Sequence, residues 1–237
     1  MSVIALLSNH ATAQQDVSFS VSNSIPPFFF ENTNKGVQYA LLAAALDSQE
    51  LRIKEVIFAP NRRTINLISS EKIDCLINAP AGLTHLYYTQ SLLDYQNLVY
   101  TLADTKLAVT DIASLGTLSL MAFQNATRYL GDDFAAMAKM NPDYLELTNQ
   151  QSQISLLFSR RVQAIVIEKH IFTYYRQQLN HKLSTQLPIN EYYFFPPSPR
   201  PIACTNAQLA EKIDRGIHQI KANGEYRRIL DNTQYTE

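Results

Sequence analysis

The chain has 237 residues, of which 46% are hydrophobic and 17% charged. This composition excludes disorder as the main state and gives room for one large or two modest domains. Twenty Lys and Arg residues against 21 Asp and Glu residues leave a net charge of −1. A chain this close to neutral lacks the basic surface that binds nucleic acid or an anionic membrane, so we expect a small or locally recognised partner.

The two cysteines, Cys75 and Cys204, exclude a disulfide-dense scaffold and the paired CxxC spacing of a structural zinc site. Two interpretations stay open for them. They form one disulfide in an oxidising compartment, or they are two buried free thiols, and the frequent burial of free cysteine favours the second.

An export signal is indicated at the start of the chain. Val3 to Leu7 is a short apolar run, and Ala11-Thr12-Ala13 before Gln14 has the form of a signal-peptidase site. No Lys or Arg precedes the run, so the signal is trimmed or atypical. No other stretch approaches the roughly 20 apolar residues that span a bilayer. We therefore expect a periplasmic protein.

The first half of the chain alternates between strand and helix patterns. Val17, Phe19 and Val21 alternate with serines, which predicts a half-buried strand that ends at Ile25-Pro26-Pro27. The elements expected after it are a helix at Val37 to Leu46, a strand at Leu51 to Ala59, a helix at Asn61 to Ser70 and a strand at Ile73 to Ile77. This order predicts parallel strands, which place ligands at their C-terminal ends.

The second half repeats this alternation. We expect strands at Leu118 to Phe123, Tyr144 to Leu147 and Val162 to Ile167, with helices at Ala126 to Met140 and Ile154 to Arg160. Tyr95 to Thr110 is strand-like but ambiguous, and Phe194 to Pro201 reads as a stiff connector without helix. We place crossings between two lobes near these two segments. A last amphipathic helix begins at the cap Thr205 to Gln208 and ends at Asn223-Gly224.

The order of these signals resembles the type 2 periplasmic solute-binding proteins of family 3, the polar amino-acid branch that serves ABC importers. The segments that carry the resemblance are Ile25-Pro26-Pro27-Phe28, Gly36, Lys72-Ile73-Asp74, Gln163 to Glu168, and Ala222 to Tyr226. It implies an α/β fold with two lobes, each a mostly parallel sheet flanked by helices, joined by a double-crossover hinge. The first lobe would comprise residues 14–100 and 200–237, and the second residues 101–199.

In the first lobe the resemblance assigns ligand contacts to two loops. Phe28 or Phe29 would form an apolar wall, although the run of phenylalanines could equally plug the lobe. Glu31 would attract an ammonium group or remain a solvated acid. Asn78 and Ala79 would offer polar groups to a ligand amine. Relatives that bind α-amino acids carry an arginine slightly further on. This sequence has none in Leu83 to Tyr88, which argues against standard α-amino-acid recognition.

In the second lobe the expected contacts follow two strands. Asn125 reads as a helix N-cap, beside backbone N–H groups open to an anion. Thr127 would add a hydroxyl and Arg128 a positive charge, although a solvated arginine is the alternative. Glu168 would pair with a ligand ammonium, and the alternative is a cap on the following helix.

These features predict a monomeric solute-binding protein that closes on a small polar molecule, such as an amino acid, and delivers it to an ABC permease. We expect no catalytic residue, metal or cofactor, because no catalytic motif and no ligand spacing of histidines occurs. One alternative is a sensory protein that presents its ligand to a membrane receptor. Another is a small-acid dehydratase on the same fold, with Glu168 as general acid.

Overall fold

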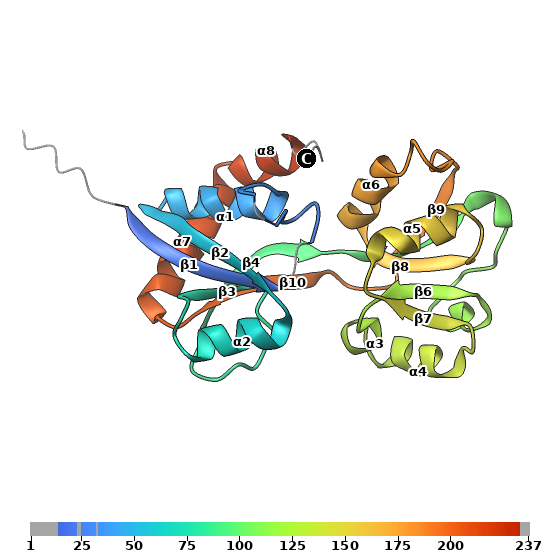
Figure 1. Ribbon diagram of the computed structural model, residues 1–237, viewed down its shortest axis with the longest axis horizontal. Coiled ribbons are helices and arrows are strands. Elements are labelled where there is room, and N and C mark those ends of the chain that lie inside the picture. The colour runs from blue at the N-terminus through green and yellow to red at the C-terminus, as the bar shows by residue number, and fades with distance from the viewer. Residues whose placement is uncertain (1–13, 23–24, 32, 233–237) are drawn as a thin grey trace, which may run out of the picture. The chain divides into compact units, whose positions relative to one another are not determined.

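The chain divides into two compact units in a computed structural model that describes residues 14–22, 25–31 and 33–232 (Figure 1). The first unit combines the N-terminal strand with Phe28–Leu92 and the segment from Arg200 onward. The second unit is formed mainly by Leu93–Pro199. The expected signal at Val3 to Ala13 lies outside the described residues. No helix in the described ranges is long and apolar enough to span a membrane.

The first unit is a five-stranded sheet with helices. Its elements are β1 (Gln15–Ser22), α1 (Val37–Asp47), β2 (Leu51–Ala59), α2 (Asn61–Ser69), β3 (Cys75–Ile77), β4 (Tyr87–Tyr95), β10 (Ser198–Cys204), α7 (Ala207–Ala222) and α8 (Glu225–Asn232). The strand order is β2-β1-β3-β10-β4. β1 runs parallel to β2 and β3, whereas the returning strand β10 runs antiparallel to β3.

The second unit has a sheet of the same size, with the order β7-β6-β8-β5-β9. Its elements are β5 (Asn97–Leu102), η1 (Ala103–Thr105), η2 (Ala113–Thr117), β6 (Leu120–Phe123), α3 (Ala126–Tyr129), α4 (Asp132–Met140), β7 (Tyr144–Leu147), α5 (Gln150–Phe158), β8 (Ala164–Glu168), α6 (Lys169–Gln178) and β9 (Ile189–Tyr192). β6, β7 and β8 are parallel, and β5 is antiparallel to both β8 and β9.

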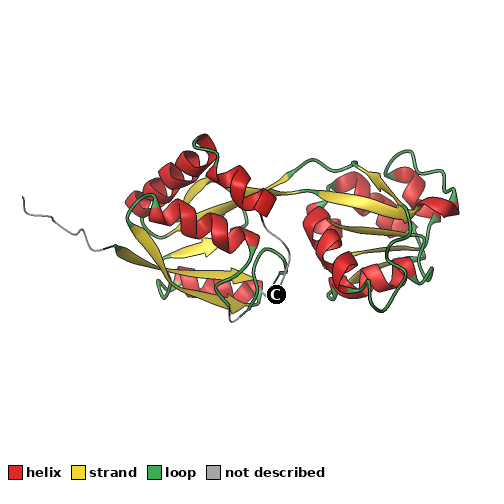
Figure 2. Ribbon diagram, turned by 90° about the horizontal axis from the view of Figure 1, so that it is seen from above, coloured by secondary structure: helices red, strands yellow, loops and turns green. Residues whose placement is uncertain are grey.

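Helices cover both faces of each sheet (Figure 2). In the first unit α1 packs against α7 and α8, while α2 packs against β1 and β3. α1 and α7 approach so closely that a Cβ at Gly216 would lie 2.1 Å from the backbone oxygen of Ala45. Only glycine therefore fits at this helix crossing. In the second unit α5 and α6 lie on one face, and α3 and α4 on the other.

The α/β fold class is confirmed, but both sheets are mixed, because the central strand of each is parallel to one neighbour and antiparallel to the other. Two predicted elements are wrong. The expected helix Ala126 to Met140 is split into α3 and α4, because Gly131 has a φ of 92° that interrupts the helix. The expected connector Phe194 to Pro201 contains the start of β10.

Prolines fit into β10 because of where they lie along the strand. Pro199 and Pro201 precede Ile202, the first residue of β10 that pairs with β3. The N–H groups of Arg200 and Ile202 donate to Ser91 Oγ and Thr89 Oγ1 of β4, at 2.7 and 3.1 Å. Because Pro199 and Pro201 lie before the part of β10 that pairs with β3, their missing N–H groups remove no hydrogen bond from that pairing.

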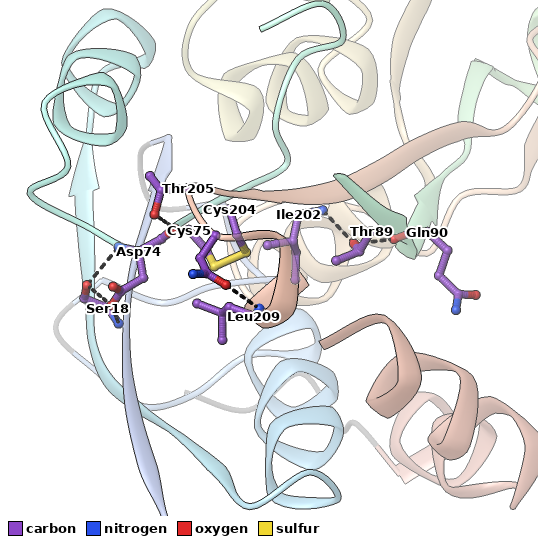
Figure 3. Close-up of a disulfide and its surroundings, with 10 residues drawn as sticks. Ser18, Asp74, Cys75, Thr89, Gln90, Ile202, Cys204, Thr205 and Leu209 are labelled. Carbon is purple, nitrogen blue, oxygen red and sulfur yellow. Dashed lines mark hydrogen bonds between the residues drawn. A yellow bond between two sulfur atoms is a disulfide. The ribbon is translucent and has the colours of Figure 1, made fainter. Parts of the chain in front are cut away.

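A disulfide joins Cys75 of β3 to Cys204 of β10, so the interpretation as free thiols is wrong (Figure 3). The two residues lie opposite each other in the antiparallel pair, with Cα atoms 4.1 Å apart, and neither is exposed. Asp74, the residue before Cys75, accepts hydrogen bonds from the Ser18 N–H and hydroxyl at 2.7 and 2.6 Å. The Thr205 N–H donates to the Asp74 carbonyl at 3.0 Å. β10 is thus fixed to β3, and the residue before β3 is fixed to β1.

Removing the disulfide should lower stability, because it closes a loop between residues 129 positions apart. In the variant Cys75→Ser/Cys204→Ser we expect the free energy of unfolding to fall by about 3–5 kcal/mol. Urea denaturation with and without reductant measures the change. Reductant should destabilise the wild type and leave the variant unaffected. Equal wild-type stability in both conditions would contradict the disulfide.

Candidate functional site

The aromatic loop after β1 is anchored inside the first unit. Phe28 and Phe29 are both fully buried. The Phe28 carbonyl accepts hydrogen bonds from the N–H groups of Gln38 and Tyr39 at 3.1 and 3.3 Å. Gly36 makes this possible, because a Cβ there would lie 2.2 Å from the Phe28 oxygen. In this structure the two rings plug the unit, which is the alternative given above, and Glu31 is exposed.

The loop after β3 is stiffened by side chains that the sequence patterns did not point to. Gln38, fully buried on α1, donates from Nε2 to Asn78 Oδ1 at 2.6 Å, and the Ala79 N–H donates to the Pro201 carbonyl at 3.0 Å. Tyr88 OH donates to the Pro80 carbonyl at 2.8 Å and accepts from the Leu83 N–H at 3.0 Å. Asn78 therefore lies in a loop that hydrogen bonds hold in place, and its side-chain amide already has a partner.

The loop after β6 differs from its prediction. Asn125 has a φ of 63° and its side chain makes no capping hydrogen bond. The Asn125 N–H donates instead to Glu146 Oε2 at 2.6 Å, and the Thr127 N–H and hydroxyl both donate to Glu146 Oε1 at 3.0 Å. The expectation that these N–H groups are open to an external anion is wrong. A carboxylate of the chain itself, on β7, already occupies them.

A tyrosine completes the environment of Glu146. Tyr144 OH donates to Glu146 Oε1 at 2.9 Å. Burial raises the pKa of Glu146, but the hydrogen bonds from Thr127, Tyr144 and Asn125 outweigh it and hold that pKa below its ordinary value. Burial, together with this acceptor, raises the pKa of Tyr144. Glu146 is therefore ionised and Tyr144 is protonated at neutral pH.

The other two predicted residues of this unit have different environments. Arg128 on α3 is exposed. Glu168 is 2% exposed and caps α6, because its Oε2 accepts from the N–H groups of His170 and Ile171 at 2.6 and 3.0 Å. Its Oε1 lies 3.0 Å from His170 Nδ1. These contacts match the helix-cap alternative for Glu168.

β6 and β8 are parallel, so the loop 124–128 and Glu168 follow their C-terminal ends at one edge of the second sheet. The loop 78–79 follows the end of β3 in the first sheet. In the described part of the chain, no cluster of His, Cys, Asp and Glu side chains could hold a metal ion.

An open groove of about 660 Å³ lies elsewhere, between α7 and β4 of the first unit, and is lined by Gln90, Asp214, Arg215 and His218 among others. Asp214 accepts from the Gln90 N–H at 2.5 Å, and Lys221 donates to the Ser91 carbonyl at 2.6 Å. The side chains of α7 thus cover part of the β4 edge. None of the predicted ligand residues lines this groove.

No protein-family model and no curated protein matches the sequence. Solved structures do match over almost the whole chain. The GluR0 ligand-binding core, solved in complex with L-glutamate, has a TM-score of 0.71 at 16% identity and covers 92% of this chain and 97% of its own. This chain has the periplasmic-binding-protein fold. Substrate-binding domain 2 of Lactococcus lactis GlnP has a TM-score of 0.66 at 19% identity, covering 94% and 97%. A histidine kinase sensor domain with similarity to periplasmic binding proteins has a TM-score of 0.71 at 12% identity, covering 94% and 97%.

The lowered pKa of Glu146 predicts a contribution to stability that depends on pH. The contribution is fully present above the unfolded value of 4.5 and is lost as pH falls through the lower folded value. Between pH 7 and pH 3 the free energy of unfolding should therefore fall more in the wild type than in Glu146→Gln. Chemical denaturation across this range measures both. Equal losses would show that Glu146 has no lowered pKa.

Proposed function

We propose that this chain is an exported solute-binding protein that captures a small polar molecule by closure of its two units, without covalent chemistry, for uptake by an ABC permease. The observation that carries the proposal is the match of fold over at least 92% of the chain to proteins whose own descriptions name ligand or substrate binding. The strand-end loops described above provide polar groups where α/β sheets place their ligands.

The proposed ligand contacts lie in both units. In the first unit they are the backbone of the loop 78–79 and the exposed side chain of Glu31. The rings of Phe28 and Phe29 support the loop that carries Glu31. In the second unit they are Arg128 and the loop before it, in which the donors of Asn125 and Thr127 are already bonded to Glu146. Arg128 is the strongest of these residues, because its guanidinium group is exposed and can donate several hydrogen bonds to a ligand oxygen. Glu168, which is already bonded to its helix, contributes by holding α6 in place.

The disulfide supports the proposed export. Buried disulfides form and persist in oxidising compartments such as the periplasm, whereas the cytosol keeps thiols reduced. A bond that fixes β10 to β3 is therefore expected to form after export.

A thermal-shift screen of the oxidised protein against amino acids, amines and small carboxylates tests the proposal. A ligand present at 100 times its dissociation constant stabilises the folded state by about 2.7 kcal/mol. We expect stabilisation by members of one chemical class. The absence of stabilisation by any compound of the three classes would argue against this function.

Replacing Arg128 should weaken binding of any ligand found in that screen that carries a carboxylate or another oxygen acceptor. We expect Arg128→Ala to raise the dissociation constant at least tenfold, about 1.4 kcal/mol, in a calorimetric titration. The control is Arg161→Ala, because Arg161 is also exposed but precedes β8, at the opposite edge of the second sheet. Equal affinity of the wild type and both variants would show that Arg128 does not bind the ligand.

A sensory role is the second candidate. It is favoured by the similarity to the histidine kinase sensor domain, whose TM-score of 0.71 equals that of the GluR0 ligand-binding core. In that case the same ligand would be presented to a membrane receptor. Crosslinking in intact cells separates the two roles, because transport requires contact with a permease and sensing requires contact with a receptor.

A further inference from the structure

We propose that Glu146 is a specificity-determining residue that excludes carboxylates from the loop of residues 124–127 and selects ligands bearing an amine there instead. This inference rests on the proposed function and narrows its ligand class. It starts from the finding that the chain supplies its own carboxylate to the polar hydrogens of this loop.

The carboxylate of Glu146 is fixed from two directions. Its backbone belongs to β7, where it pairs with Ala122 of β6. Tyr144 lies two residues earlier, hence on the same face of the strand, and its hydroxyl donates to Oε1 at 2.9 Å. The Tyr144 ring packs edge-to-face against the buried Phe134, with centroids 5.8 Å apart. Glu146 is therefore positioned before any ligand arrives.

A ligand carboxylate would have to displace this group. Both would need the N–H groups of Asn125 and Thr127, and the tethered carboxylate has the advantage of a high local concentration. Two carboxylates side by side also repel each other.

A ligand amine, in contrast to a carboxylate, would be attracted by the Glu146 carboxylate. The three donors Thr127 N–H, Thr127 hydroxyl and Tyr144 hydroxyl converge on Oε1, whereas among the described residues Oε2 accepts only from the Asn125 N–H. A carboxylate oxygen can accept more than one hydrogen bond, and Glu146 is partly exposed. In the described part of the chain Glu146 forms no ion pair with Arg128 or another cation. Its negative charge is thus available to an ammonium group.

Pairs of probes that differ only by a carboxylate test this inference. We would titrate the oxidised protein by calorimetry with agmatine and arginine, and with putrescine and ornithine. In at least one pair we expect the amine to bind at least tenfold more tightly than its amino acid. In Glu146→Ala that ratio should fall at least tenfold, because the amine loses its partner and the N–H groups become free for the carboxylate.

Two variants secure the interpretation. Glu191→Ala, which removes a carboxylate from β9 of the same unit, should leave the ratio unchanged. If Glu146→Ala does not fold, Glu146→Gln removes the charge and keeps an acceptor, and the ratio should fall there too.

An amino acid that binds the wild type as tightly as its amine, or a ratio unaffected by Glu146 substitution, would overturn the inference. The inference would also be overturned if none of the four probes binds while another compound from the thermal screen does. In that case the proposed solute-binding function would stand. If no compound binds at all, the proposed solute-binding function would be contradicted.

Discussion

The pairing of β10 with β3, closed by the Cys75–Cys204 disulfide, is the constraint on which the rest of the first unit depends. It brings residues from the two ends of the chain into one sheet. α7 follows β10 directly and packs on α1, where Gly216 permits close contact. The same strand holds the loop after β3, because the Pro201 carbonyl accepts from the Ala79 N–H. Fold stability and loop geometry are thus linked through one strand.

The strand-end loops of each unit have polar groups that are largely engaged within the protein. Gln38 bonds Asn78, Glu146 bonds Asn125 and Thr127, and Glu168 caps α6. Such internal bonds fix the loops in advance and lower the entropy lost on binding. They also decide which ligand groups meet a free partner. In the second unit the Arg128 guanidinium is exposed, and Glu146 is partly exposed while both of its oxygens accept hydrogen bonds.

Local sequence patterns predicted most of the elements. The alternation of Val17, Phe19 and Val21 with serines gave β1, and Leu51 to Ala59 matches β2 residue for residue. The patterns failed where a single backbone conformation or a distant partner decides the structure. Gly131 splits a continuous helical pattern, and the prolines of β10 are tolerated only because their neighbours bond to β4. β4, β9 and α8 were not predicted.

The chemistry of the site was harder to predict than the fold, because it depends on contacts between distant residues. Glu146 reads in the sequence as an ordinary polar residue of a short strand. Its partners Asn125 and Thr127 lie about twenty residues earlier, on the neighbouring strand's loop. Likewise, the disulfide between Cys75 and Cys204 was the less favoured of two interpretations, since nothing local shows that β3 and β10 are neighbours. The position of Glu168 at the start of α6 was one of the two predicted alternatives, because its partners His170 and Ile171 lie within three residues of it.

Calorimetric titration of the oxidised protein with the ligand from the screen, followed by mass spectrometry of the recovered ligand, tests the central claim most directly. The account predicts saturation at one ligand per chain and a ligand of unchanged mass. A product of altered mass would show an enzyme instead, and the absence of saturable binding would contradict the solute-binding function.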